Sequence, residues 1–305
     1  MGAASAGGAA GRVDNACILK KHPPPLPEVN FSDEGPVRHL HLGTPWIQGS
    51  MLLESPFDIE LDYVQRMMAW LLFVEPASVA KRHAMQLGLG AAALTKFCHK
   101  KLRMKTTAIE LNPQVVAACR LWFKLPADDA RLSVVLGDAA EVAAHDHWRG
   151  QIDALQVDLY DHEAAAPVLD SAAFYADCRR LLTEDGCMTV NLFGRSSSFQ
   201  RSVDNMAMAF GDDALWAFKA TREGNTVVLA QRTPSRPGRE ALALRAETSK
   251  PAGVCPRPSG CGCSNPAGNH EHGHAAHTHC RHRPPGPRRL APAGRLGPGR
   301  RPDHG

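Results

Sequence analysis

The segment LGLGAAA at residues 87–93 decides the fold, because its two glycines join a short apolar stretch to a helical one. Small residues at such a strand-to-helix turn let backbone N–H groups and a helix N-terminus approach a ligand closely. Alone, the segment is equally consistent with a tight turn that binds nothing. Because Gly88, Gly90 and Ala93 also satisfy the dinucleotide fingerprint, a nicotinamide-dependent dehydrogenase is an alternative, although nothing downstream suggests a hydride site.

Acidic residues follow at two places where a bound nucleoside needs them. Glu110 ends the next apolar stretch, 20 residues beyond Gly90, where a carboxylate can accept hydrogen bonds from both ribose hydroxyls. Gly137 and Asp138 end the third stretch, where the carboxylate can accept from an adenine amine and the glycine leaves room for the ring. Asp138 can instead cap the helix that follows it. These residues, together with Gly88, are candidate nucleoside ligands.

Short apolar stretches and helical periods alternate through the middle of the chain. This alternation predicts an α/β fold with a parallel sheet and helices on both faces, of the Rossmann-like kind. Two late apolar runs, at 215–218 and 226–230, are predicted to finish the sheet as an antiparallel pair. The expected strands are 84–87, 106–109, 132–136, 152–157 and 188–192, and the expected helices are 91–99, 113–123 and 172–182.

The ends of the chain differ in character from its middle. Residues 1–34 are mostly small and polar and are predicted to form a flexible arm. Apolar residues at 37–42 and 46–53 predict a β-hairpin, and those at 61–74 repeat at helical spacing. We therefore divide the chain into the arm, a hairpin-and-helix subdomain (35–75), a nucleoside-binding domain (76–232) and a tail (233–305).

The tail is predicted to be disordered, since it holds 12 of the 23 prolines and few large apolar residues. A marginal helix at 240–248 is its one expected element. Cys261, Cys263 and the histidines between His270 and His282 could bind a metal adventitiously. No Cys-x-x-Cys pair accompanies them, so we predict no functional metal site.

Charge and hydropathy exclude several classes of function. The net charge is +4, but the tail contributes 12 Lys/Arg against 4 Asp/Glu, so residues 1–232 sum to −4. A basic groove for nucleic acid is therefore not expected. No apolar run approaches the roughly 18 residues of a membrane helix, and the N-terminus lacks a signal-peptide pattern, which predicts a cytoplasmic protein.

Two aspartates follow the fourth strand of the predicted sheet. Asp158 and Asp161 lie at the sheet edge where open α/β folds bind ligands. A carboxylate there can bind an amine and accept its proton, which a primary amine must lose before it attacks a sulfonium carbon. The alternative is that one aspartate caps the next segment while the other binds loop amides.

With these motifs in order, residues 38–232 resemble the polyamine aminopropyltransferases, the spermidine synthase family, which has the class I methyltransferase fold. The resemblance implies that Gln48 joins Glu110 and Asp138 in holding the nucleoside, that Tyr63 lines the amine channel, and that Asp158 and Asp161 handle the attacking amine. The matching segments are WIQGSM at 46–51, Tyr63, LGLG at 87–90, IELNP at 109–113, VLGDA at 135–139, Asp158 with Asp161, and Phe174 with Tyr175.

The sequence departs from this family at two places that recognise the amine. The family carries an aspartate in its glycine loop to bind the aminopropyl amine, and this chain has Ala91 there. The family also has a Pro-Thr-Tyr-Pro-like segment before its late strands, which residues 210–214 do not match. Both differences concern the amine and leave the nucleoside positions intact.

Three functions remain open at this point. The resemblance implies an aminopropyltransferase that uses decarboxylated S-adenosylmethionine as co-substrate and putrescine or a similar small amine as acceptor, with no permanently bound cofactor and with a homodimer built on the hairpins. Ala91 favours a small-molecule methyltransferase that uses intact S-adenosylmethionine. The incomplete amine subsite is also consistent with a non-catalytic relative that binds nucleosides.

Overall fold

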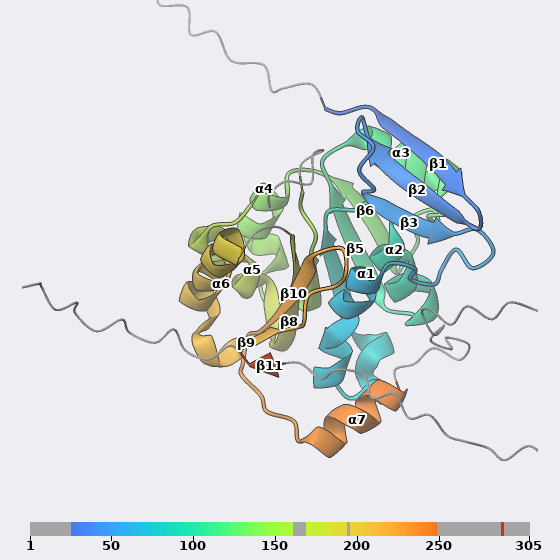
Figure 1. Cartoon of the computed structure of the whole chain (residues 1–305). Helices are drawn as coiled ribbons and strands as arrows, with labels where there is room; N and C mark the ends of the chain where they lie inside the picture. Colours follow the sequence, from blue (N-terminus) through green and yellow to red (C-terminus); the bar gives the residue numbers. More distant parts are fainter. Residues whose placement is uncertain (1–25, 161–168, 194–195, 249–287, 290–305) are drawn as a thin grey trace, which may run out of the picture.

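A mixed eight-stranded sheet organises the computed structural model, which describes residues 26–160, 169–193, 196–248 and 288–289 (Figure 1). Its strand order is β11-β9-β10-β8-β7-β4-β5-β6. The strands are β4 (His83–Leu87), β5 (Lys105–Glu110), β6 (Leu132–Leu136), β7 (Ile152–Val157), β8 (Leu182–Phe193), β9 (Leu215–Ala217), β10 (Asn225–Gln231) and β11 (Arg288–Arg289).

Five neighbouring strands, β6, β5, β4, β7 and β8, are parallel, while β10 and β9 are antiparallel additions. The predicted fold class is confirmed, and the two late strands pair as expected. Every residue of β4 is buried, which is typical of a strand covered by helices on both faces. The chain order reverses beside β4, whose neighbours are β5 and β7, and ligands bind at such a switch point.

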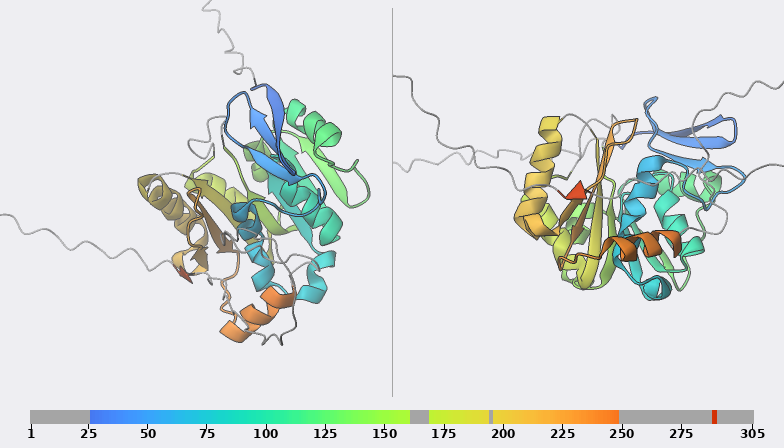
Figure 2. Two further views of the ribbon diagram at one scale, coloured as in Figure 1. Left: turned by 45° about the vertical axis from the view of Figure 1, so that its right-hand side comes forward. Right: turned by 60° about the horizontal axis from the view of Figure 1, so that its bottom comes forward.

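Helices cover both faces of the sheet (Figure 2). One face packs against α4 (Ala139–Ala144), α5 (Ala172–Leu181) and α6 (Ser196–Phe210). The other packs against α1 (Asp62–Met67), α2 (Ala93–Lys96) and α3 (Pro113–Trp122). Shorter turns are 3-10 helices at Met68–Phe73, Pro76–Lys81, Asp146–Trp148 and Asp212–Ala214, and a π turn at Phe97–Lys101.

The N-terminal subdomain is a three-stranded antiparallel sheet, not the predicted two-stranded hairpin. Strands β2 (Val37–Leu42) and β3 (Gly49–Leu52) match the expected pair, and β1 (Val29–Glu34) is added at the edge. Five of the six β1 side chains are exposed, so β1 lacks the apolar alternation that marks a strand. Backbone pairing with β2 and the stacking of Phe31 on Trp122, with ring centroids 5.2 Å apart, hold it instead. The folded region therefore begins inside the segment that we assigned to the arm.

Two of the observed α-helices are shorter than the apolar segments from which they were predicted. The run at 61–74 changes from α1 to a 3-10 helix at Met68. The helix expected at 91–99 begins at Ala93, because Ala92 has a left-handed backbone with φ 57° and belongs to the glycine turn. Helix α6 was not predicted.

The predicted tail helix is observed as α7 (Arg239–Thr248). Its Arg245 binds the backbone oxygen of Leu72 and forms an ion pair with Glu75 at 2.5 Å. A second described part of the tail, Arg288–Arg289, pairs with β9 as β11, which the prediction of disorder did not include. The cysteines and histidines considered for metal binding lie outside the described residues. Among the described residues, no group of three or more His, Cys, Asp or Glu side chains could hold a metal, and no helix is long and apolar enough to span a membrane.

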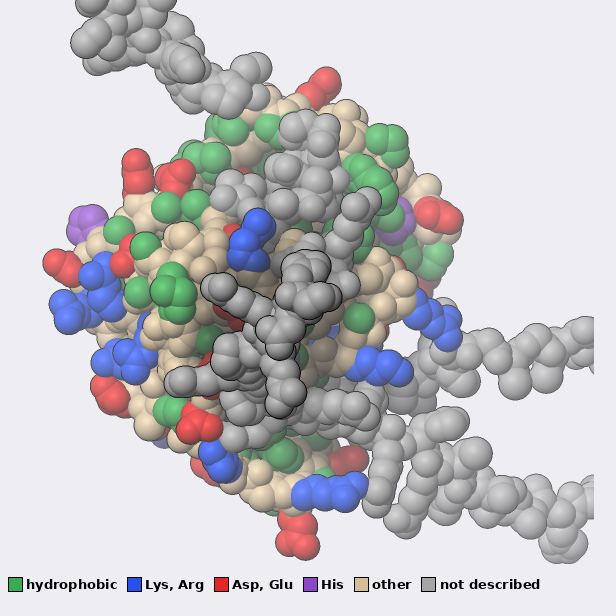
Figure 3. All heavy atoms as spheres, turned by 60° about the vertical axis from the view of Figure 1, so that its left-hand side comes forward, with side chains coloured by type: hydrophobic (Ala, Val, Ile, Leu, Met, Phe, Trp, Pro, Cys, Tyr) green, Lys and Arg blue, Asp and Glu red, His purple; other side chains and the backbone are tan. Residues whose placement is uncertain are grey.

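Figure 3 shows one face of the molecule with side chains coloured by type. Basic and acidic side chains are interspersed among the described residues visible there. This face therefore has mixed charge rather than a continuous basic surface.

Lys96 lies inside the core between α2 and α3. Its side chain is 1% exposed, and its Nζ donates a hydrogen bond of 2.7 Å to the backbone oxygen of Phe123. Burial lowers the pKa of Lys96 from 10.5 to about 8, while the nearby Cys119 acts in the opposite direction. At pH 7 the ammonium group is still charged, and burying this charge lowers the stability of the folded state by an amount on the order of 3 kcal/mol.

We predict that Lys96→Met stabilises the protein by about 1–3 kcal/mol at pH 7, because a thioether chain of similar length fills the space without a charge. The unfolded chain binds more protons than the folded one between pH 8 and 10.5, so the wild type gains stability as the pH rises through this window. The stability advantage of Lys96→Met over the wild type should therefore become smaller as the pH rises from 8 to 10.5.

Urea unfolding at pH 7 and pH 10 measures this difference, and Lys100→Met, an exposed neighbour in the same segment, is the control. A destabilised Lys96→Met variant at both pH values would show that the ammonium group contributes more by its hydrogen bond than its burial costs.

Candidate active site

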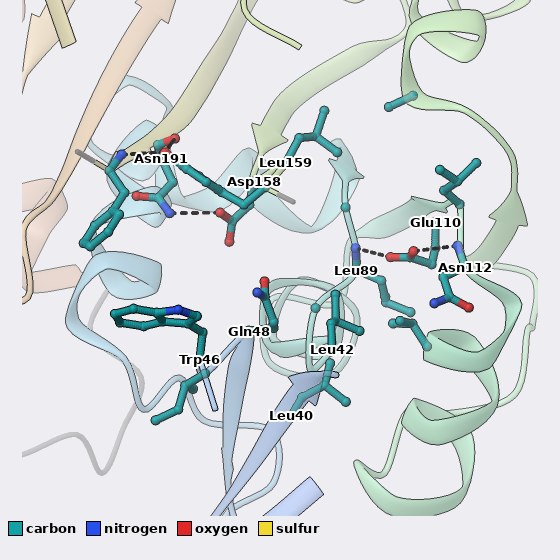
Figure 4. Close-up of a pocket in the computed structure, with 18 of the residues that line it drawn as sticks. Leu40, Leu42, Trp46, Gln48, Leu89, Glu110, Asn112, Asp158, Leu159 and Asn191 are labelled. Carbon is teal, nitrogen blue, oxygen red and sulfur yellow. Dashed lines mark hydrogen bonds between the residues drawn. The ribbon is translucent and has the colours of Figure 1, made fainter. Parts of the chain in front are cut away.

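A cleft of about 840 Å³ opens at the carboxyl ends of the parallel strands, next to the three-stranded sheet (Figure 4). Its walls come from the loops that follow β4, β5, β6 and β7, from α1 and from the segment between β2 and β3. Figure 4 shows Gln48 pointing into the cleft between Asp158 and Glu110. The predicted residues that line it are Gln48, Tyr63, Gly88, Gly90, Glu110, Gly137, Asp138 and Asp158. Asp161 lies outside the described residues.

The glycine loop forms the floor of the cleft. Gly88 has φ +90°, and a Cβ added there would lie 2.4 Å from the backbone oxygen of Asp158. The Gly88 amide donates to the Ile109 oxygen, and the Asp158 amide donates to the Leu87 oxygen, each at 3.0 Å. The loop therefore passes directly over the end of β7, which only a residue without a side chain permits at this φ.

Glu110 is bound to the same loop. Its Oε2 accepts from the Leu89 amide at 3.0 Å, and its Oε1 accepts from the Asn112 amide at 2.8 Å. Burial raises the pKa of Glu110, and these backbone hydrogen bonds act in the opposite direction. A carboxylate has about four lone-pair positions, so these backbone contacts do not use all of them and the carboxylate can still accept from a ligand hydroxyl.

Asp138 caps α4, as the alternative interpretation of the sequence proposed. Its Oδ1 accepts from the amides of Ala140 at 2.7 Å and Glu141 at 3.4 Å. The cap fixes the carboxylate at the wall of the cleft beside Gly137, so the structural role and a ligand-binding role are compatible.

Asp158 lies at the opposite end of the cleft from Glu110. Tyr63 donates to its Oδ2 at 3.2 Å, and the Nδ2 of Asn191 donates to its Oδ1 at 2.9 Å. Both donors are neutral, and no ion pair is formed with Asp158 in the described part of the chain. Burial is the main cause of the raised pKa of Asp158, which the two hydrogen bonds partly offset. Burial and the Asp158 carboxylate also raise the pKa of Tyr63 well above 10, so Tyr63 remains a donor.

Sequence analysis missed two asparagines in this region. Asn191 lies near the end of β8, and Asn225 begins β10. Asn191 stands between the buried apolar residues Val190 and Leu192, and a lone amide inside such a run is the signal that would have identified it.

Ala91, the position where the family carries an aspartate, does not line the cleft. It is 2% exposed and packs against β3, where a Cβ added at Gly49 would lie 2.8 Å from its own Cβ. The glycine loop therefore packs directly against the N-terminal sheet at Ala91.

The cleft is strongly acidic. No lysine, arginine or histidine is among the described residues that line it. Its acidic lining residues are Glu60, Asp62, Glu110, Asp138, Asp158 and Glu223. Glu60 is an example of a lining carboxyl group without a partner in the described part of the chain. Its Oε2 is buried with no hydrogen bond, and burial raises the pKa of Glu60. Such a cleft favours cationic ligands.

Comparison with known proteins identifies the family of this chain. The chain is 33% identical over 224 residues to the polyamine aminopropyltransferase of Neisseria meningitidis serogroup A, which covers 73% of this chain and 83% of the relative. The enzyme of the same name from Chromobacterium violaceum gives the same identity and coverage. The chain belongs to the polyamine aminopropyltransferase family. No protein-family model matches it.

Solved structures support the fold of this family member. A probable spermidine synthase from Corynebacterium glutamicum superposes with a TM-score of 0.58 at 16% identity, covering 71% of this chain and 82% of the other. Human methyltransferase-like protein 13, solved in complex with SAH, superposes with a TM-score of 0.56 at 20% identity, covering 66% and 98%. The central domain therefore has the class I methyltransferase fold.

We predict that Gly88→Ala destabilises the protein by about 2–4 kcal/mol, because the new methyl group meets the Asp158 oxygen and φ +90° is unfavourable for alanine. Gly137→Ala is the matched control, since its Cβ would lie 3.7 Å from the nearest atom, in Val142, and we expect a change within about 1 kcal/mol. Thermal and urea unfolding measure both. Equal stability of the two variants would contradict the close approach of the loop to β7.

Proposed function

We propose that this protein transfers an aminopropyl group from decarboxylated S-adenosylmethionine to a small amine such as putrescine. The acidic cleft, which has no basic side chain among its described lining residues, is the observation that carries the proposal. The decarboxylated donor bears a sulfonium and an ammonium group, and a diamine acceptor bears two ammonium groups, so both substrates are cations. Intact S-adenosylmethionine has a carboxylate as well, for which the described lining residues offer no cationic partner.

The nucleoside half of the donor is assigned to the end of the cleft that contains Glu110. The free lone pairs of Glu110 would accept from the ribose hydroxyls, and Gln48 lies across from it (Figure 4). Asp138 would accept from the adenine amine, and Gly137 leaves space for the ring beside it. This arrangement directs the sulfonium toward Asp158 at the other end.

Asp158 is proposed as the proton acceptor. The acceptor amine passes a proton to the Asp158 carboxylate. The amine nitrogen then forms a bond to the aminopropyl methylene carbon that is attached to sulfur. The carbon–sulfur bond breaks, its electron pair stays on sulfur, and neutral methylthioadenosine leaves. A carboxylate whose pKa is raised by burial is a stronger base than one in water, which helps the proton transfer.

The amine channel is assigned to the wall near Tyr63. The Tyr63 hydroxyl orients Asp158, and its ring contributes to the apolar cluster beneath α1. Asp161 is retained as a second ammonium ligand from the family resemblance. Because Ala91 is closed off against β3, the ammonium group of the donor would be bound by carboxylates elsewhere in the cleft, such as Glu60.

We infer that the acceptor is a free small molecule and not a nucleic acid. A homodimer formed through the N-terminal sheet and a cytoplasmic location remain expectations from the family resemblance and the sequence.

We predict that Asp158→Asn lowers turnover by about 10²- to 10⁴-fold, because the amide cannot accept the amine proton. Asn191 can still donate to the amide oxygen, and the Tyr63 hydroxyl can rotate to accept from its NH₂ group, so the affinity for methylthioadenosine should change little. Single-turnover assays with putrescine and each donor, together with calorimetry of methylthioadenosine binding, measure both quantities. Asp177→Asn, which removes a carboxylate on α5 that is paired with Arg180, is the control.

Three outcomes separate the candidate functions. Full turnover by Asp158→Asn would exclude the proposed mechanism. Methyl transfer from intact S-adenosylmethionine, with the decarboxylated donor inactive, would establish a methyltransferase. Binding of methylthioadenosine without consumption of either donor would indicate a non-catalytic relative.

A further inference from the structure

The side chain of Asn225 is linked through Asn191 to the candidate catalytic carboxylate, and both asparagines line the cleft. Its Nδ2 donates to the Oδ1 of Asn191 at 3.1 Å, and the Nδ2 of Asn191 donates to the Oδ1 of Asp158 at 2.9 Å. Three side chains from β10, β8 and the end of β7 therefore form one directed chain of hydrogen bonds.

The register of the two strands explains the contact. Asn225 is opposite Phe193 and Asn191 is opposite Val227, so the asparagines are diagonal neighbours on one face of the antiparallel pair. Diagonal neighbours are within reach of side chains of this length. The backbone of Asn225 is fixed separately, because its N–H and C=O groups both bind Thr221.

An asparagine amide can be placed in two orientations that differ by exchange of its oxygen and nitrogen. If Asn191 had the reverse orientation, its oxygen would face the Oδ1 of Asp158, and two acceptors would repel each other. The shape of Asn191 does not select between the two orientations, so its hydrogen-bond partners must do so: the Asp158 carboxylate favours the NH₂ group on one side, and a donor facing the Oδ1 of Asn191 favours the same orientation from the other side. Asn225 supplies a donor at the Oδ1 of Asn191.

We propose that Asn225 is a positioning residue that fixes the amide of Asn191 with its NH₂ group toward Asp158, and so orients the carboxylate at the acceptor amine. Asn225 acts through Asn191 and needs no contact with the substrate. The effect on turnover rests on the function proposed above, whereas the effect on the ionisation of Asp158 does not.

The ionisation of Asp158 reports the orientation directly. The hydrogen bond from Asn191 lowers the pKa of Asp158, so its loss should raise that pKa. The other groups around Asp158 are unchanged by a substitution at position 225. They are Tyr63 on α1, Tyr160 on the same loop, and Glu60, Asp62 and Glu223 in the cleft.

The experiment is a double-mutant cycle on the full-length protein without ligand. Asn191→Leu, Asn225→Leu and the double variant are compared with the wild type by ¹³C NMR titration of the Asp158 carboxyl carbon, assigned with Asp158→Asn. We expect each single variant to raise the pKa of Asp158 and the second substitution to add nothing once Asn191 is absent. Thr226→Val, on the opposite face of β10, is the control, and Asn225→Ala serves if the leucine variant does not fold.

Turnover measured in the same variants separates this proposal from the proposed function. Asn225→Leu should lower kcat about threefold to tenfold while the KM for the amine changes less than twofold, and it should have no effect in the Asn191→Leu background. An unchanged pKa in Asn225→Leu, or effects that add in full to those of Asn191→Leu, would overturn the positioning role. If the pKa values follow the expected pattern but the protein consumes neither donor, the positioning role of Asn225 is supported and the proposed aminopropyl transfer is rejected.

Discussion

The close approach of the glycine loop to the end of β7 is the constraint on which the rest of the site depends. Because Gly88 has no side chain, the loop crosses directly over the backbone of Asp158, and Leu89 then presents its amide to Glu110. The loops after three neighbouring strands are thus held together by backbone hydrogen bonds and by the Glu110 carboxylate, which accepts from the amides of Leu89 and Asn112. An open α/β sheet binds its ligand among such loops, at the switch point of the strand order.

Two carboxylates of the resulting cleft, Glu110 and Asp158, form no ion pair within the described part of the chain, whereas Asp62 is paired with Arg66. Glu110 and Asp158 are stabilised by neutral amide and hydroxyl donors, which leave each carboxylate short of a counter-ion. Burial then raises their pKa values, and a bound cation would reverse this shift. Buried carboxylates of this kind favour the binding of an amine, because the ammonium group supplies the positive charge that the neighbouring side chains lack.

The sequence was sufficient to predict the parallel strands, because buried strands are short apolar runs whose ends are marked by Gly88, Glu110 and Asp138. It was insufficient for β1, whose exposed polar side chains resemble an arm and whose pairing depends on β2. Asn191 carried a local signal, a lone amide within an apolar run, but its contact with Asn225 follows from the register between β8 and β10, which no local pattern encodes. The capping role of Asp138 and the backbone ligands of Glu110 likewise required the folded geometry.

Ala91 shows how a change in a binding loop can be coupled to a neighbouring sheet. Its methyl group packs where Gly49 offers no side chain, so the glycine loop and β3 are in direct contact. A carboxylate at position 91 would be buried in this contact, where it would lose its hydration without gaining a hydrogen-bond partner or a counter-ion. Under the proposed function, recognition of the donor amine therefore falls to another wall of the cleft. Glu60 lines that cleft, and its buried Oε2 has no hydrogen-bond partner among the described residues, so a cation bound there would supply one.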